Sequence, residues 1–272
     1  TNVNDIEFIQ PAGTTGIQTT ATVFIHASGA IVGNANSATD IQATAAELTA
    51  ANGIGSTNTI ETQINTLAAS NTTANDINIT NSGPLTIANV GVTLGVTNSA
   101  GNVNISAQSP LTVNSPVTAA GDITLIAGNS VSAGDDLTIA ANVQSTVNNS
   151  TITLQAGDSI IQTAGQVGSD GVSTGIIINA TADVEGDSDA DSGGAVFNQS
   201  GGSFVSNGGN ITISSYGDGT INLVNAGGGN VSITSTNGAI NAVTDDGTAD
   251  VVGLVISLVA NNGGIGTKIK DV

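Results

Sequence analysis

The sequence lacks several residue types on which common protein classes depend. It has no cysteine, tryptophan, methionine or arginine, and only two lysines and one histidine among 272 residues. Without cysteine the chain can form no disulfide, so the sequence does not indicate whether the protein works in an oxidising or a reducing compartment. With almost no basic residues the chain cannot neutralise phosphate, which excludes nucleic-acid binding and predicts repulsion from anionic membranes. No apolar run approaches the roughly 20 residues of a membrane-spanning helix, so no membrane insertion is expected.

The residues that are present favour short strands and tight turns. Valine, isoleucine, leucine and alanine supply most of the 39% hydrophobic fraction, beside only four phenylalanines and one tyrosine. Such a core must be narrow, because aromatic side chains normally fill the widest parts of an interior. The formal charge is −19, yet the mean hydropathy of +0.21 is too high for a disordered acidic chain. With 36 glycines as turn formers, the composition predicts an all-β protein.

A short motif recurs along most of the chain. It consists of a turn residue followed by alternating apolar and small polar residues, as in Asp122-Ile123-Thr124-Leu125. Other copies begin at Asp76, Asn102, Asp136, Thr151, Asn210 and Asn230. Alternation with a period of two is the pattern of a strand whose two faces meet different surroundings. The copies lie about 14 to 26 residues apart, except for one longer gap over residues 155–210.

The spacing predicts a parallel β-helix, or β-solenoid, with coils of roughly 20 residues. Each coil would contribute two or three short strands that stack on the next coil at about 4.8 Å. Inward positions would take Val, Ile and Leu, outward positions Thr, Ser and Asn, and corners Gly, Asn and Asp. The alternative is a series of tandem antiparallel β-sandwiches. The solenoid is favoured because two-residue hairpin signals and aromatic core residues are both scarce.

A second, longer periodicity links the two ends of the chain. The order Val23-Phe24-Ile25, Gly29-Ala30-Ile31 and Asp40 returns as Val231-Ser232-Ile233, Gly238-Ala239-Ile240 and Asp250, followed by related glycine-rich segments at 52–55 and 263–266. The offset drifts only from 208 to 211 residues. We therefore predict a single continuous solenoid over residues 1–272, holding about 1.3 copies of a roughly 210-residue unit.

The glycine-rich motifs resemble those of a known family. The segments 228–235 and 237–240, with relatives at 127–129, 156–160 and 262–267, are similar to the repeats of filamentous-haemagglutinin-type and giant β-strand-repeat bacterial surface proteins. That resemblance implies a right-handed parallel β-helix that serves as an adhesive or structural stalk outside a bacterial cell. No Arg-Gly-Asp sequence and no secretion-domain signature accompany the repeats, so only the stalk region is implied.

Candidate catalytic residues are few. A polysaccharide lyase needs cationic groups to stabilise a carboxylate or enolate, and the only lysines are Lys268 and Lys270 at the extreme end. His26 is the sole histidine, and a lone histidine is more often a surface or structural residue than a functional one. The doublets Asp135-Asp136 and Asp245-Asp246 are the candidates for a hydrolase pair, which needs only two carboxylates. Neighbouring strand residues point to opposite faces, so both doublets are interpreted as solvated turns and no enzyme is predicted.

The densest acidic segment is predicted to be a protruding loop over residues 183–194. Asp187, Asp189 and Asp191 alternate in it as the first ligands of a calcium loop do, since hard oxygen ligands come from every second residue. Ser192 stands where such a loop has its turn glycine, and Asn198 where it has its bidentate glutamate. The segment is therefore either a calcium site or a solvated acidic loop. Calcium is the only cofactor that the sequence suggests.

Three functions remain open at this stage. The first is an extracellular or cell-surface rod, structural or adhesive, that binds a host or matrix glycan or protein. Such a rod would either self-associate head-to-tail, as a filament or surface-layer subunit does, or continue covalently in a longer repeat array. The second is a carbohydrate-active β-helix enzyme, and the third is a calcium-dependent binding module.

Overall fold

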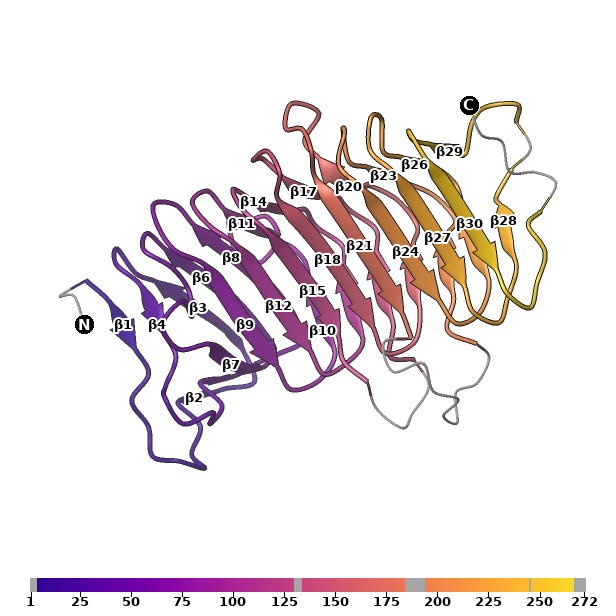
Figure 1. Ribbon diagram of the computed structural model, residues 1–272. Helices are drawn as coiled ribbons and strands as arrows, with labels where there is room; N and C mark the ends of the chain where they lie inside the picture. Colours follow the sequence, from indigo (N-terminus) through magenta and orange to yellow (C-terminus); the bar gives the residue numbers. More distant parts are fainter. Residues whose placement is uncertain (1–3, 130–133, 184–193, 245, 267–272) are drawn as a thin grey trace.

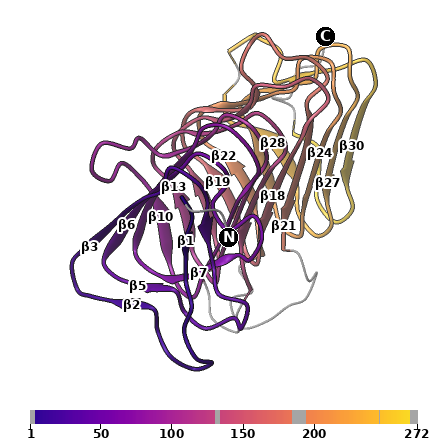
Figure 2. The same ribbon diagram turned by 90° about the vertical axis from the view of Figure 1, so that its left-hand side faces the viewer.

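The computed structural model describes residues 4–129, 134–183, 194–244 and 246–266, and the described residues contain strands but no helix. The strands are parallel and stack into a β-solenoid of about ten turns, as predicted from the alternating motif. Figure 1 shows the stack from the side, with the two ends of the chain at opposite ends of the rod, and Figure 2 shows it turned toward the N-terminal end. No helix in the described part is long and apolar enough to cross a membrane.

Two parallel sheets wrap around a single apolar core. Sheet A has eleven strands: β2 (Ile17–Gln18), β5 (Ile41–Gln42), β7 (Ile60–Gln63), β9 (Ile77–Asn81), β12 (Val103–Ala107), β15 (Ile123–Ala127), β18 (Thr151–Ala156), β21 (Ile177–Ala182), β24 (Ile211–Ser215), β27 (Val231–Ser235) and β30 (Ile256–Ala260). A short pair, β1 (Ile6–Glu7) and β4 (Ile31–Val32), extends it at the N-terminal end.

Sheet B consists of two rows that form the other two sides. The first row is β10 (Leu85–Ile87), β13 (Leu111–Val113), β16 (Leu137–Ile139), β19 (Ile160–Gln162), β22 (Phe197–Gln199), β25 (Gly219–Ile221) and β28 (Ile240–Ala242). The second row is β11 (Val96–Asn98), β14 (Val117–Ala119), β17 (Val143–Ser145), β20 (Gln166–Ser169), β23 (Ser203–Val205), β26 (Val224–Asn225) and β29 (Val251–Val252). The longer strands β3 (Thr22–His26), β6 (Ala45–Ala50) and β8 (Thr66–Asn71) precede both rows, and β8 pairs with β10 and with β11.

The period-two pattern is what places side chains inside or outside. In β15 the residues Ile123, Leu125 and Ala127 are buried, whereas Thr124 and Ile126 between them are partly exposed. Strand pairing is in register, so each buried residue stacks on a similar one in the next coil. One such row runs Ile79, Ile105, Leu125, Leu154, Ala180, Ile213 and Ile233, and it ends at the partly buried Leu258. Each large buried member contributes about 1.5–3 kcal/mol relative to an exposed position.

Coil length varies, although the register does not. Val103 pairs with Ile123, so this coil takes 20 residues, whereas Ile178 pairs with Ile211 across 33. Most coils are therefore longer than the roughly 20 residues predicted. In the coil from Ile77 to Val103, for example, most of the additional residues lie in the connection 88–95, which leaves the strand pairing unchanged.

Asparagine and aspartate at one set of corners join successive coils. The side chain of Asp76 accepts a hydrogen bond from the backbone N–H of Asn102 (2.8 Å), and Asn102 accepts one from Asp122 N–H (2.8 Å). Asp122 in turn accepts one from the backbone N–H of Thr151 (2.8 Å), and Asp218 accepts one from Ala239 (2.7 Å). Each corner oxygen thus satisfies a backbone donor that would otherwise lack a partner.

Buried amides satisfy the backbone at another corner. Gln199 Nε2 donates to Gln162 Oε1 (2.7 Å), and both side chains are fully buried. Gln162 donates to the carbonyl oxygen of Gly165 (2.9 Å), and Gln199 Oε1 accepts from the backbone N–H of Asn222 (2.8 Å). These polar side chains can lie inside the core because their donors and acceptors are used.

The N-terminal coils are less regular than the rest. Here the pairing of sheet A is divided between two lines: Ile31 bridges to Ile54 and Ile54 to Ile77, while Ile60 pairs with Ile79 farther along the same strand. The segment 55–59 connects the two lines. Gly55 has a φ of +70° and lies against the backbone oxygen of Asn78, so this turn requires a residue without a Cβ.

The segments that suggested a 210-residue unit lie on different sheets. Val23 and Ile25 belong to β3 of sheet B, whereas Val231 and Ile233 belong to β27 of sheet A. Ile31 continues sheet A, and its counterpart Ile240 lies in sheet B. The 210-residue repeat therefore stays a prediction from the sequence, while the described strands form one continuous stack.

Candidate functional surfaces

The residues proposed for calcium lie outside the described residues. Asp187, Asp189 and Asp191 belong to the segment 184–193, as do most positions of the acidic loop. Its first residue, Asp183, is described, and its backbone N–H donates to the carbonyl oxygen of Asp158 (2.9 Å). Within the ranges that the structure describes, no three His, Cys, Asp or Glu side chains gather closely enough to hold a metal ion. The calcium site stays a prediction.

Asp135 is buried, at 5% exposure, so the predicted solvated turn is wrong for this member of the Asp135-Asp136 doublet. Asp136 is half-buried, and its carboxylate accepts from the backbone N–H of Ser159 (3.1 Å). Burial raises the pKa of Asp136, and the nearby carboxylates of Asp158 and Asp135 add to the shift. Asp246 is exposed, and hydrogen bonds from the side chain and N–H of Thr248 lower its pKa. Asp245 lies outside the described residues.

The single histidine and the two lysines do not form a described site. His26 is exposed on β3, where Nδ1 is 2.7 Å from the hydroxyl oxygen of Thr49 on the next coil. Lys268 and Lys270 lie outside the described residues. Among the candidates that the structure describes, only Asp135 and Asp136 lie together, with Asp158 beside them.

A buried carboxylate joins three N-terminal coils. Asp40 is fully buried and accepts hydrogen bonds from Gln10 Nε2 (2.9 Å), from the backbone N–H and side chain of Asn34, and from the backbone N–H of Glu61 (3.1 Å). Its neighbour Glu61 has a pKa raised to about 7 by burial, by repulsion from Asp40 and by a hydrogen bond to Asp40. Glu61 is therefore largely protonated below neutral pH, although an isolated glutamate would be ionised there.

A second buried carboxylate lies beneath a surface hairpin. Glu47 points outward from β6 but is only 2% exposed, because the connection 88–95 folds over it. The hydroxyl of Thr93 donates to Glu47 Oε1 (2.5 Å), and Val90 packs on Ala45 and Ala68. Val92 and Leu94 of the hairpin are exposed beside Phe24, and the three side chains form a small apolar patch.

The outer face of sheet A is broad and free of ionisable side chains from β9 to β30. Two rows of outward side chains run along this face. The first row is Asn78, Asn104, Thr124, Thr153, Asn179, Thr212, Ser232 and Ser257. The second row is Thr80, Ser106, Ile126, Gln155, Thr181, Ser214, Thr234 and Val259. The carboxylates lie instead at corners, as Asp76, Asp122 and Asp218 do. The face is thus neutral although the chain is strongly acidic.

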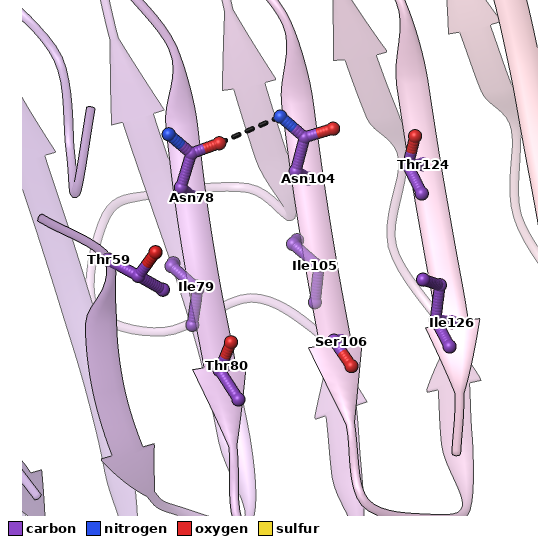
Figure 3. A pocket seen from close by; sticks show the side chains of 9 residues that line it. All are labelled: Thr59, Asn78, Ile79, Thr80, Asn104, Ile105, Ser106, Thr124 and Ile126. Atoms are coloured by element: carbon purple, nitrogen blue, oxygen red, sulfur yellow. Dashed lines mark hydrogen bonds between the residues drawn. The ribbon is translucent and has the colours of Figure 1, made fainter. Parts of the chain in front are cut away.

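A shallow hollow of about 210 Å³ interrupts this face near its N-terminal end. Figure 3 shows the side chains that line it, from Thr59 across β9 and β12 to β15. Ser106 is smaller than its row neighbours Thr80 and Ile126, so a step opens above it. Asn104 Nδ2 donates to Asn78 Oδ1 (2.7 Å), and Asn78 Nδ2 donates to the carbonyl oxygen of Gly55 (3.1 Å).

Comparison with protein-family models, with curated proteins and with solved structures finds no match for this chain.

Proposed function

We propose that this chain forms an extracellular structural or adhesive rod on a bacterial surface.

The proposed rod rests on one observation above all: in-register stacking continues without interruption from β9 to β30. Every coil packs only on its neighbours, so stiffness and length come from repetition rather than from a compact centre. A chain built in this way separates what lies at its two ends by a fixed distance. This is the property that a structural or adhesive stalk needs.

The use of the carboxylates supports a rod over the carbohydrate-active enzyme. Asp76, Asp122 and Asp218 accept backbone hydrogen bonds from the following coil, so they stabilise the stack. A glycosidase instead needs two carboxyl groups that face each other across a sugar. We therefore propose a non-enzymatic role, with the acidic corners keeping a β-rich surface soluble outside the cell.

The last described coil supports continuation of the stack. Ile256, Leu258 and Ala260 lie above the buried residues Val231, Ile233 and Ser235 but are themselves only partly buried. A further coil with the same pattern would bury them, either as a covalent continuation or as part of a second subunit packed head-to-tail.

Small-angle scattering and sedimentation test the rod. About ten turns at roughly 4.8 Å each give a particle about 50 Å long, and the scattering profile should be that of an elongated body. A concentration-dependent increase in length would identify head-to-tail association, and a constant length would argue against it. A compact, isotropic particle would contradict the proposal. Incubation with soluble polysaccharides should release no reducing ends.

A further inference from the structure

We infer that the hollow on sheet A binds a neutral, hydroxyl-rich sugar unit of a polysaccharide. The inference names a ligand class for the adhesive rod proposed above, and it rests on that function only for its biological setting. The binding chemistry itself is argued from the nine side chains that line the hollow (Figure 3).

The lining determines the charge of the ligand. It consists of Thr59, Asn78, Ile79, Thr80, Asn104, Ile105, Ser106, Thr124 and Ile126, none of which is ionisable. An anionic ligand would find no cation in the lining to offset its loss of hydration. A cationic ligand would be drawn instead to the carboxylates at the corners. A neutral polar ligand is the class that this lining fits.

The side-chain amides of Asn78 and Asn104 determine which hydrogen-bonding groups of the lining face a ligand. Asn78 Nδ2 donates to Gly55, so Asn78 Oδ1 must accept from Asn104, and this fixes the orientation of the Asn104 amide. Its Oδ1 then points toward Thr124 (Figure 3). Within the described residues, this oxygen and the hydroxyls of Thr80, Ser106 and Thr124 form no hydrogen bond with other side chains or backbone. They form a preorganised set that alternating sugar hydroxyls can use.

The size and the apolar surface of the hollow fit one ring. A volume of about 210 Å³ is below the roughly 300–1,000 Å³ of pockets for drug-sized ligands, so it holds a single small unit. Ile126 lies partly exposed at one side and offers an apolar surface for the C–H groups of a sugar. The hollow therefore takes one unit of a polymer rather than a long stretch of it.

Binding to neutral oligosaccharides tests the inference. The protein would be titrated, by calorimetry and on an immobilised panel, with gluco-, manno-, galacto- and N-acetylglucosamine oligosaccharides, and with uronate oligosaccharides as the anionic comparison. We expect at least one neutral series to bind and the uronates not to bind. Ser106→Leu fills the hollow and should weaken that binding at least about tenfold, which corresponds to 1.4 kcal/mol.

Thr234→Leu is the matched control, because Thr234 lies in the same outward row on β27, away from the hollow. It should leave binding unchanged, and circular dichroism should show that both variants keep the wild-type fold. Equal weakening by both variants, or no binding of any neutral series, would overturn the inference. Neither result would alter the length measured by scattering, so failure here is distinct from failure of the rod.

Discussion

The N-terminal coils and the coils after residue 96 differ in how their strands are arranged and in which residues they bury. From β11 onward each coil repeats three short strands, and inward apolar rows run through the stack. Before that point sheet A is divided, the strands β3, β6 and β8 span two rows, and Asp40 and Glu47 are buried. The regular coils rely mainly on apolar stacking and also bury Asp135 and Asp250, whereas the N-terminal coils hold Asp40 against Glu61, whose pKa is raised to about 7.

This difference predicts where the molecule is sensitive to pH and where it is not. Apolar rows have no titratable group, so their stability changes little between pH 5 and pH 8. The pair of Asp40 and Glu61 has no cationic partner in the described structure, and its second ionisation places two negative charges side by side. Substitutions in the regular coils and in the N-terminal coils should therefore differ in how their effect on stability depends on pH.

The largest effect should come from the apolar row of the regular coils. Leu154 is fully buried in β18, so Leu154→Ala removes packing with Leu125 below and Ala180 above. We expect a loss of about 2–5 kcal/mol in the free energy of unfolding, measured by denaturant titration. Thr153→Ala, at the outward position beside it, should change stability by less than about 0.5 kcal/mol. Equal losses would show that Leu154 is not a core residue.

An intermediate and pH-dependent effect should come from Glu61. Its pKa is about 7 in the folded state against 4.5 ordinarily, so the folded chain retains a proton that the unfolded chain releases. The associated stability is fully present below pH 4.5 and is lost as the pH rises to about 7. Because Glu61 is partly exposed to solvent, we expect a loss of only about 1–2 kcal/mol.

Glu61→Gln removes that titration. The variant should be more stable than wild type at pH 8 and should lose the Glu61 component of the pH dependence, as measured by thermal unfolding at pH 5 and pH 8. The comparison with wild type cancels the contribution of the other carboxylates. A variant that follows the wild-type pH profile would mean that the pair is not protonated as described.

The smallest effect should come from a corner. Asp218→Ala removes the acceptor for the backbone N–H of Ala239, and we expect a loss of about 0.5–1.5 kcal/mol. Asp218→Asn keeps an oxygen at this position and should retain most of the stability, because Asn210 accepts the equivalent bond from Asn230 N–H (2.9 Å). If alanine and asparagine were equally stable, the corner bond would contribute nothing measurable.

The sequence predicts the regular part of the fold well. Residues 122–125 show the turn residue and the alternation directly, and the structure has Asp122 at a corner and Ile123 and Leu125 inside. Such features are local, so a single strand contains the whole signal. The coil length is not local. It depends on how many residues each corner holds, and the spacing between motifs therefore predicted shorter coils than most of those observed.

The candidate surfaces could not be predicted in the same way. Asp40 and Glu61 lie 21 residues apart and are brought together only by the pairing of Ile41 with Thr62. The hollow arises from the relative sizes of Thr80, Ser106 and Ile126, which come from three coils. Without the register between coils, neither arrangement has a signal in the linear sequence.

The connection between the two rows of sheet B has a consequence for how such a chain can change. Residues 88–95 join Ile87 to Val96, whereas in the next coil residues 114–116 join Val113 to Val117. Ile87 still pairs with Val113, and Val96 with Val117, so five additional residues leave the register intact. Residues 88–95 cannot be shortened without exposing Glu47, but insertions at the corner 114–116 should cost little folding free energy. Mutation can rewrite the side of the rod while selection preserves its interior, and a foreign peptide placed at this corner should be displayed without altering the stack.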